Sequence, residues 1–114
     1  MNHPKDHRFG AHCLADAWQL DQIHQQIQTS ATWLQTYLQT YQSLLKQHPR
    51  NYPKLERLQL SILTEATLLQ NLLNQHINLT QKNKDSFITS TAYIRQAENL
   101  LYVAQTTLIH PIKP

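Results

Sequence analysis

The sequence has almost none of the residues that tight turns and covalent cross-links need. It contains one glycine, Gly10, and one cysteine, Cys13, in 114 residues. β-Hairpins rely on residues that tolerate positive φ, so a chain whose single glycine lies near its start is a poor candidate for a sheet. One cysteine excludes an internal disulfide framework and gives no support for a zinc finger. The composition therefore predicts an all-α protein, and the cysteine usage predicts a cytoplasmic one.

Charge and long apolar runs are scarce as well. Charged residues make up 15% of the chain, and the net charge is +3 with the histidines neutral. This excess is too small to indicate a nucleic-acid partner by itself. No apolar run reaches the roughly 18 residues of a membrane span, and the polar start lacks the apolar core of a secretory signal. Hydrophobic residues at 40% still allow a core, so we expect one soluble domain with no membrane partner.

Apolar residues spaced three and four apart predict a long first helix. The stripe lies in residues 12–47, which contain no proline or glycine: Leu20, Ile23, Ile27, Ala31, Leu34, Leu38, Tyr41 and Leu45. Thr29-Ser30 could cap a second helix within this segment, so one helix and two helices are both considered. Pro49 disfavours helical geometry in the residue before it, and the helix is expected to end near His48.

Two further helices follow. The second is predicted from about Pro53 to Ile77, with a broad leucine-rich face that is typical of a central helix. The third is predicted to follow an N-cap at Asp85 or Ser86 and to end near Ile109. In the third, large residues recur every seven positions with small ones between them: Phe87, Ile94, Leu101 and Leu108, with Ser90, Ala97 and Ala104. This alternation suits close, antiparallel packing.

These segments predict a small antiparallel bundle of three long helices, or of four if residues 12–47 break near Thr29-Ser30. Residues 1–11 are expected to form a flexible arm, residues 12–110 the bundle, and residues 111–114 a short tail. The first helix is the longest, so its N-terminal part either overhangs or folds back as a fourth helix. An overhang would expose apolar residues that a monomer tolerates poorly: Leu14, Trp18, Leu20 and Ile23. The geometry thus favours four helices or a homodimer.

The sequence offers no catalytic or metal-binding set. His3 and His7 have the spacing of two ligands on one helix face, but they lie where no helical pattern exists, and no second ligand pair follows. The acidic residues are scattered singly, which gives no pair for acid–base catalysis. A glycine-rich phosphate loop and a nucleophile motif are also missing. We therefore expect a protein that is not an enzyme, with no metal, cofactor or small-molecule substrate.

Aromatic residues on the first helix supply the leading hypothesis about function. The segment "WLQTYLQTYQSLL" places Trp33 and Tyr37 beside the predicted core positions. Either these rings cover the edge of the core, or they form a docking surface together with Trp18 and Leu44, because Trp and Tyr are enriched among interface anchors. We expect a non-catalytic adaptor, regulator or inhibitor that binds another protein, a second copy of itself included.

Basic residues around the proline-containing loop supply the alternative: Lys46, Arg50, Lys54 and Arg57. A compact patch of cations can bind phosphates, so the alternative is a small basic nucleic-acid-binding or replication accessory protein. Cations also gather at loops and helix C-termini because of solvation and the helix dipole. Both interpretations of the patch stay open.

The segment "RFGAHCL", residues 8–14, resembles a motif of the primosomal replication protein C family. Members of that family are small basic helical bundles that assist helicase loading. The aspartate that follows the phenylalanine in the family is Gly10 here, and the rest of the chain does not align with it. No family is assigned from these residues.

Overall fold

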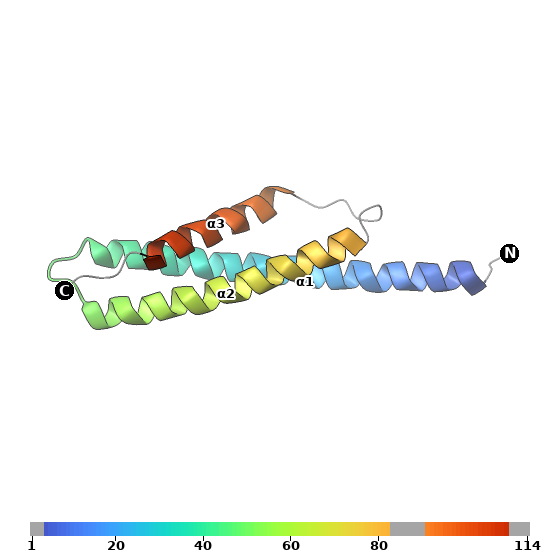
Figure 1. Cartoon of the computed structure of the whole chain (residues 1–114). Helices are drawn as coiled ribbons and strands as arrows, with labels where there is room; N and C mark the ends of the chain where they lie inside the picture. The colour runs from blue at the N-terminus through green and yellow to red at the C-terminus, as the bar shows by residue number, and fades with distance from the viewer. Residues whose placement is uncertain (1–3, 83–90, 110–114) are drawn as a thin grey trace.

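The chain forms an antiparallel bundle of three helices (Figure 1). The computed structural model describes the backbone of residues 4–82 and 91–109 and the side chains of residues 18–81, 92 and 94–109. The helices are α1 (Pro4–Leu45), α2 (Tyr52–Lys82) and α3 (Thr91–Ile109). Helix α2 runs antiparallel to α1, and α3 runs antiparallel to α2; the described residues contain no strand. The predicted all-α antiparallel bundle is confirmed.

Helix α1 continues without a break through Thr29 and Ser30, so the four-helix alternative is wrong. Ser30 is 2% exposed, and its hydroxyl donates a 2.7 Å hydrogen bond to Oε2 of Glu65 in α2. The hydroxyl thus serves the contact between two helices rather than the start of a new one. Ile27 and Leu34, on either side of Ser30, are both fully buried. Burial of one unbroken apolar stripe favours one unbroken helix.

The helices are longer than the sequence pattern predicts. Helix α1 begins at Pro4, so residues 4–11, which were expected to form a flexible arm, are helical. Proline is tolerated in a first helical turn, and one internal glycine costs only about 1 kcal/mol relative to alanine. Helix α2 continues past Ile77 to Lys82. Several predicted features lie outside the described residues: the N-cap at Asp85 or Ser86, the positions Phe87 and Ser90, and the tail at residues 111–114.

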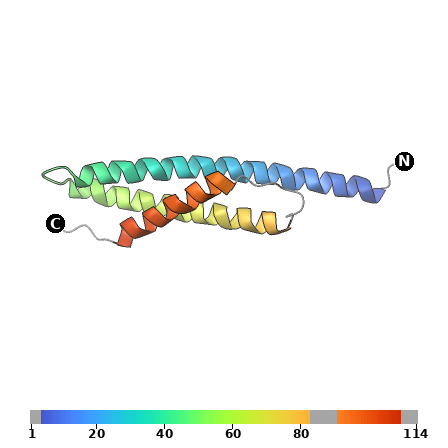
Figure 2. The ribbon, with the colours of Figure 1, turned by 90° about the horizontal axis from the view of Figure 1, so that it is seen from above.

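The first helix overhangs the second and does not fold back. Its N-terminal turns extend beyond the end of α2, and the molecule measures 74 × 18 × 16 Å (Figures 1 and 2). The overhang starts nearer the N-terminus than expected, because Leu20 is 5% exposed and Ile23 is partly buried against the core. Trp18 is exposed, as the overhang predicts, and the side chain of Leu14 lies outside the described part.

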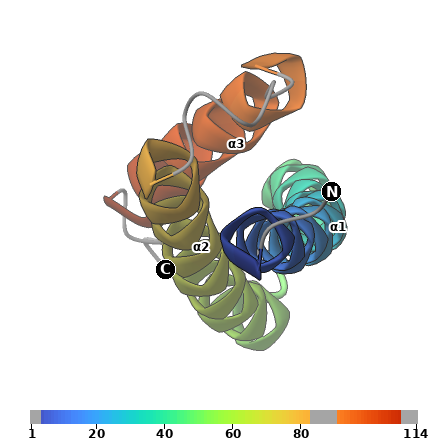
Figure 3. The same ribbon diagram turned by 90° about the vertical axis from the view of Figure 1, so that its right-hand side faces the viewer.

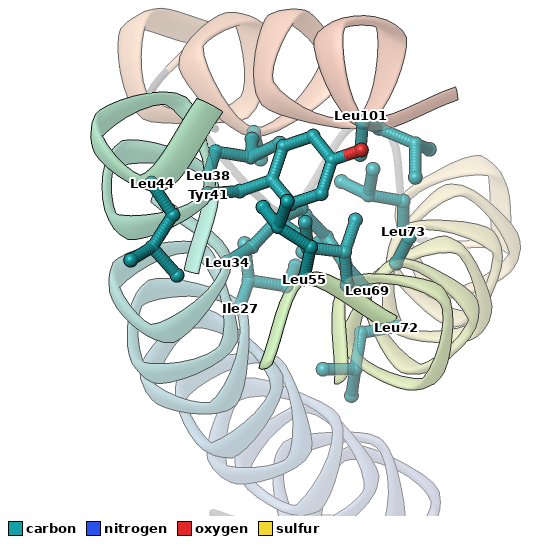
Figure 4. Close-up of a cluster of buried hydrophobic side chains, with 14 residues drawn as sticks. Ile27, Leu34, Leu38, Tyr41, Leu44, Leu55, Leu69, Leu72, Leu73 and Leu101 are labelled. Carbon is teal, nitrogen blue, oxygen red and sulfur yellow. The ribbon is translucent and has the colours of Figure 1, made fainter. Parts of the chain in front are cut away.

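The core lies along the seam between α1 and α2, and α3 covers one side of it (Figure 4). The largest fully buried side chains are Ile27, Leu34, Leu55, Ile62 and Leu69. Full burial of each stabilises the fold by about 1.5–3 kcal/mol relative to leaving it exposed. Ala97 and Ala104 of α3 are fully buried, and Leu101 between them is 7% exposed. The described part of the predicted large–small alternation therefore faces the core.

A candidate protein-binding groove

A groove runs between α1 and α2. It consists of two adjoining hollows, of about 580 Å³ and 710 Å³, and none of the described side chains of α3 lines either of them. Viewed along the bundle, α3 lies over one side of the α1–α2 pair (Figure 3). We call this feature the α1–α2 groove and define it by six of its lining residues: Trp18, Gln22, Gln26, Trp33, Leu68 and Gln75. Both hollows share its three glutamines, so the groove is continuous.

Of the predicted interface aromatics, Trp18 and Trp33 line the α1 side of this groove and Tyr37 does not. Trp18 is 65% exposed and Trp33 is 53% exposed. Tyr37 is partly buried against the core, and Trp33 stacks on it with ring centroids 5.9 Å apart. Leu44 is 6% exposed and belongs to the buried cluster that includes Leu55, so its place in the predicted interface is wrong. Tyr37 therefore contacts both the core and the ring of Trp33.

The surface around the groove is almost free of charge. In residues 18–45 the only charged side chain is Asp21, and in residues 58–81 it is Glu65. Glutamine, asparagine, threonine and serine occupy most of the exposed positions instead. Interface centres in proteins are depleted of charged residues and enriched in aromatic ones, and this face has both properties. The depletion can be read from the sequence, and our sequence interpretation missed it as a signal of function.

The two acids of this region are both engaged within the chain. Gln25 donates a 3.2 Å hydrogen bond from Nε2 to Oδ2 of Asp21, and Ser30 donates to Glu65. Ser30 and Glu65 both line the larger hollow. Hydrogen bonds to a carboxylate are among the stronger ones in proteins. They leave a groove whose polar groups are chiefly amides, which suits uncharged hydrogen-bonding partners.

Two histidines meet across α1 and α2. The ring centroids of His24 and His76 are 5.2 Å apart, and the rings are tilted by 35°. His76 is 5% exposed, and its Nε2 is buried without a hydrogen-bond partner. Burial lowers the pKa of both imidazoles below 6.5; Asp21 partly opposes this for His24, and His24 lowers the pKa of His76 further. Among the described side chains, no group of three or more potential metal ligands exists. Two imidazoles held this way form a neutral packing contact.

The predicted cationic residues gather at the turn between α1 and α2. Lys46, Arg50, Lys54 and Arg57 are all exposed there. Arg50 donates from Nε to the carbonyl of Leu45 at 3.2 Å, which satisfies an acceptor at the C-terminus of α1. The N–H of Lys54 donates to Oδ1 of Asn51 at 3.2 Å, and this bond caps the start of α2.

No protein-family model, curated protein or solved structure matches this chain. The part of the chain that the structure describes has no helix with the length and apolarity that a membrane crossing requires. Two surfaces are candidates for a function, the α1–α2 groove and the cationic turn.

Proposed function

We propose that this protein is a non-catalytic helical bundle that acts by binding a protein, a second copy of itself included, in the α1–α2 groove. The observation that carries the proposal is the exposure of Trp18 and Trp33, each more than half accessible, on a face nearly free of charge. Tryptophan is the residue most enriched among binding hot spots, and clustered exposed apolar groups usually mark interaction sites. A surface that binds a protein is sufficient for an adaptor, regulator or inhibitor.

The dimensions of the groove fit a helical partner. Trp18 and Trp33 are fifteen residues apart on one helix, which corresponds to about 22 Å. A partner helix of about four turns would cover this length, with its apolar side chains against the tryptophans and Leu68. The glutamine amides between them would bond polar groups of the partner. The ligand class is thus an amphipathic helix with an uncharged contact face.

Removal of the Trp33 ring is expected to weaken partner binding by about 30-fold, the loss typical of a hot spot. The wild-type chain and Trp33→Ala are immobilised at equal density, and the affinity of any protein captured from the host extract is then measured with purified components. Leu60→Ala is the matched control, because Leu60 is 66% exposed on α2 and does not line the groove. Equal affinity of Trp33→Ala and Leu60→Ala would contradict the proposal. Loss of helicity in Trp33→Ala would instead show that the ring is part of the core.

A second candidate function is nucleic-acid binding at the cationic turn. The observation that favours it is the segregation of charge: residues 46–57 contain four Lys or Arg and one acid, whereas residues 18–45 and 58–81 contain no Lys or Arg. Such a local excess can bind phosphates even when the net charge of the chain is small.

The affinity of this turn for a single-stranded oligonucleotide is expected to fall steeply as the salt concentration rises. Each phosphate contact is expected to lower log K by about 0.7 per unit increase in the logarithm of the salt concentration. Lys46→Gln combined with Lys54→Gln is expected to reduce this slope by about 1.4, since two contacts are lost. Both side chains are exposed, and both residues support the turn through backbone N–H groups, so the fold is retained. Absence of binding at low salt would remove this candidate.

A further inference from the structure

The two ends of the α1–α2 groove have similar linings. Trp33 of α1 and Leu68 of α2 line one end, and Trp18 of α1 and Leu79 of α2 line the other. Gln26 lies close to midway between the two tryptophans along α1 and lines both hollows. In a two-fold interface a contact of residue i with residue j of the copy is matched by the contact of j with i, so an axis near Gln26 would bring the Trp18 end of each copy onto the Trp33 end of the other.

We infer that the occupant of the groove is a second copy of this chain, related by a two-fold axis that passes near Gln26. In this arrangement the two α1 helices run antiparallel. Trp18 of each copy then lies against the partner's Trp33 and Leu68. The inference rests on the proposed function, since it names the partner that the groove binds.

The size of the face agrees with what a stable dimer needs. An axis at Gln26 pairs residues 7–45 of each α1 with the same residues of the partner's α1, over about 58 Å of helix at 1.5 Å per residue. At a helix diameter of about 10–12 Å, this contact offers on the order of 600 Å² per copy, against about 800 Å² per partner in a standard interface. The area is sufficient without any rearrangement of the helices.

The distribution of charge also suits self-association. In a two-fold dimer each charge on the face meets the same set of charges on its copy, so a face rich in one sign repels itself. This face contains no Lys or Arg in residues 18–45 and 58–81, and its two carboxylates already accept hydrogen bonds within their own chain. Neither Asp21 nor Glu65 lies at the midpoint of the groove, so the axis places no pair of like charges in contact.

In the same two-fold dimer, the overhanging turns of α1 pack against the second copy. The N-terminal turns of α1 extend beyond the end of α2, and no other helix among residues 4–82 and 91–109 lies beside them (Figures 1 and 2). When two α1 helices pair in antiparallel fashion about Gln26, these turns run alongside the C-terminal half of the partner's α1. One two-fold axis therefore accounts for both the groove and the overhang.

The oligomeric state of the full chain tests this inference. Light scattering is expected to give twice the chain mass of 13.4 kDa. The measurement extends to about 100 μM protein, because interfaces of this size include weak ones of micromolar affinity. Gln26→Glu is expected to halve the mass, since it places two carboxylates together at the axis. The glutamate is a good helix former on an exposed position, so the monomer stays helical.

Cysteine cross-linking then locates the axis. In a Cys13→Ser background, Gln26→Cys is expected to form a disulfide-linked dimer on mild oxidation, because a residue on a two-fold axis meets its own copy. Leu60→Cys is the matched control and is expected to stay monomeric, since Leu60 lies away from the groove. When the Trp18→Cys and Trp33→Cys variants are mixed, they are expected to form a disulfide-linked dimer with each other. Neither variant alone is expected to form one.

Two outcomes would overturn the inference. A mass of 13.4 kDa at every concentration excludes the second copy, and the proposed function then stands or falls separately on the effect of Trp33→Ala on another protein. A dimer that survives Gln26→Glu and does not cross-link at position 26 uses a different surface.

Discussion

Ala31→Pro is expected to lower the free energy of unfolding by about 3 kcal/mol or more. Residue 31 lies in the interior of a helix that continues from Pro4 to Leu45. A proline there removes the hydrogen bond from its own N–H to the carbonyl of Ile27, and its ring clashes with that carbonyl. Urea denaturation followed by circular dichroism measures the loss.

The same substitution distinguishes one helix from two. If Ser30 capped a separate helix, residue 31 would be its first residue, where proline is tolerated or favourable. Ala31→Gly is the matched control, because it loosens the helix by about 1 kcal/mol without a clash. A loss for Ala31→Pro no larger than that for Ala31→Gly would mean that α1 is interrupted at Ser30.

The continuity of α1 shows what local sequence patterns can and cannot predict. Ile27 and Leu34 are seven residues apart on one apolar stripe, and both are fully buried, as their spacing predicts. Ser30 has the local signature of an N-cap, so the pattern alone leaves a break open. The residue that decides is Glu65, thirty-five positions away, which accepts the hydrogen bond of the Ser30 hydroxyl. A contact between distant segments is not visible in local periodicity.

Helix boundaries were predicted less well than helix identity, for a related reason. The sequence pattern detects a helix through the apolar face that it buries, and turns that bury little lack such a face. Residues 4–11 have no apolar periodicity, and they belong to the overhanging end of α1. Helix α2 likewise continues beyond the last position of its broad leucine face.

The candidate site was predictable in part. Trp18 and Trp33 were chosen as aromatic residues outside the core stripe, and both are exposed. Leu44 lies eleven residues, or about three turns, after Trp33 and so shares its face of α1. It is buried because it packs in the same cluster as Leu55, where the chain returns in α2. Whether α2 covers this face of α1 depends on where α2 begins. The sequence of α1 alone does not contain that information.

The stability of the bundle is expected to decrease as the pH falls below about 6.5, because of the His24–His76 contact. Burial lowers the pKa of both histidines in the folded state, whereas the unfolded chain binds their protons near 6.5. The unfolded state thus takes up more protons below 6.5, and unfolding becomes more favourable there. The contribution is complete above 6.5 and is lost as the pH falls toward the two lowered pKa values. The slope is at most about 1.4 kcal/mol per pH unit for each histidine.

Urea denaturation between pH 7.5 and about 5.5 measures this slope across the range in which the unfolded chain binds protons at its histidines. His24→Gln combined with His76→Leu is expected to flatten the profile, because neither replacement binds a proton. His76→Leu alone also removes the buried Nε2 that has no hydrogen-bond partner, so stability at pH 7.5 is expected to be retained or increased. His48→Gln is the matched control, since His48 is exposed in the turn and lies outside the His24–His76 contact. A profile equally steep in the double variant would show that other groups cause the acid sensitivity.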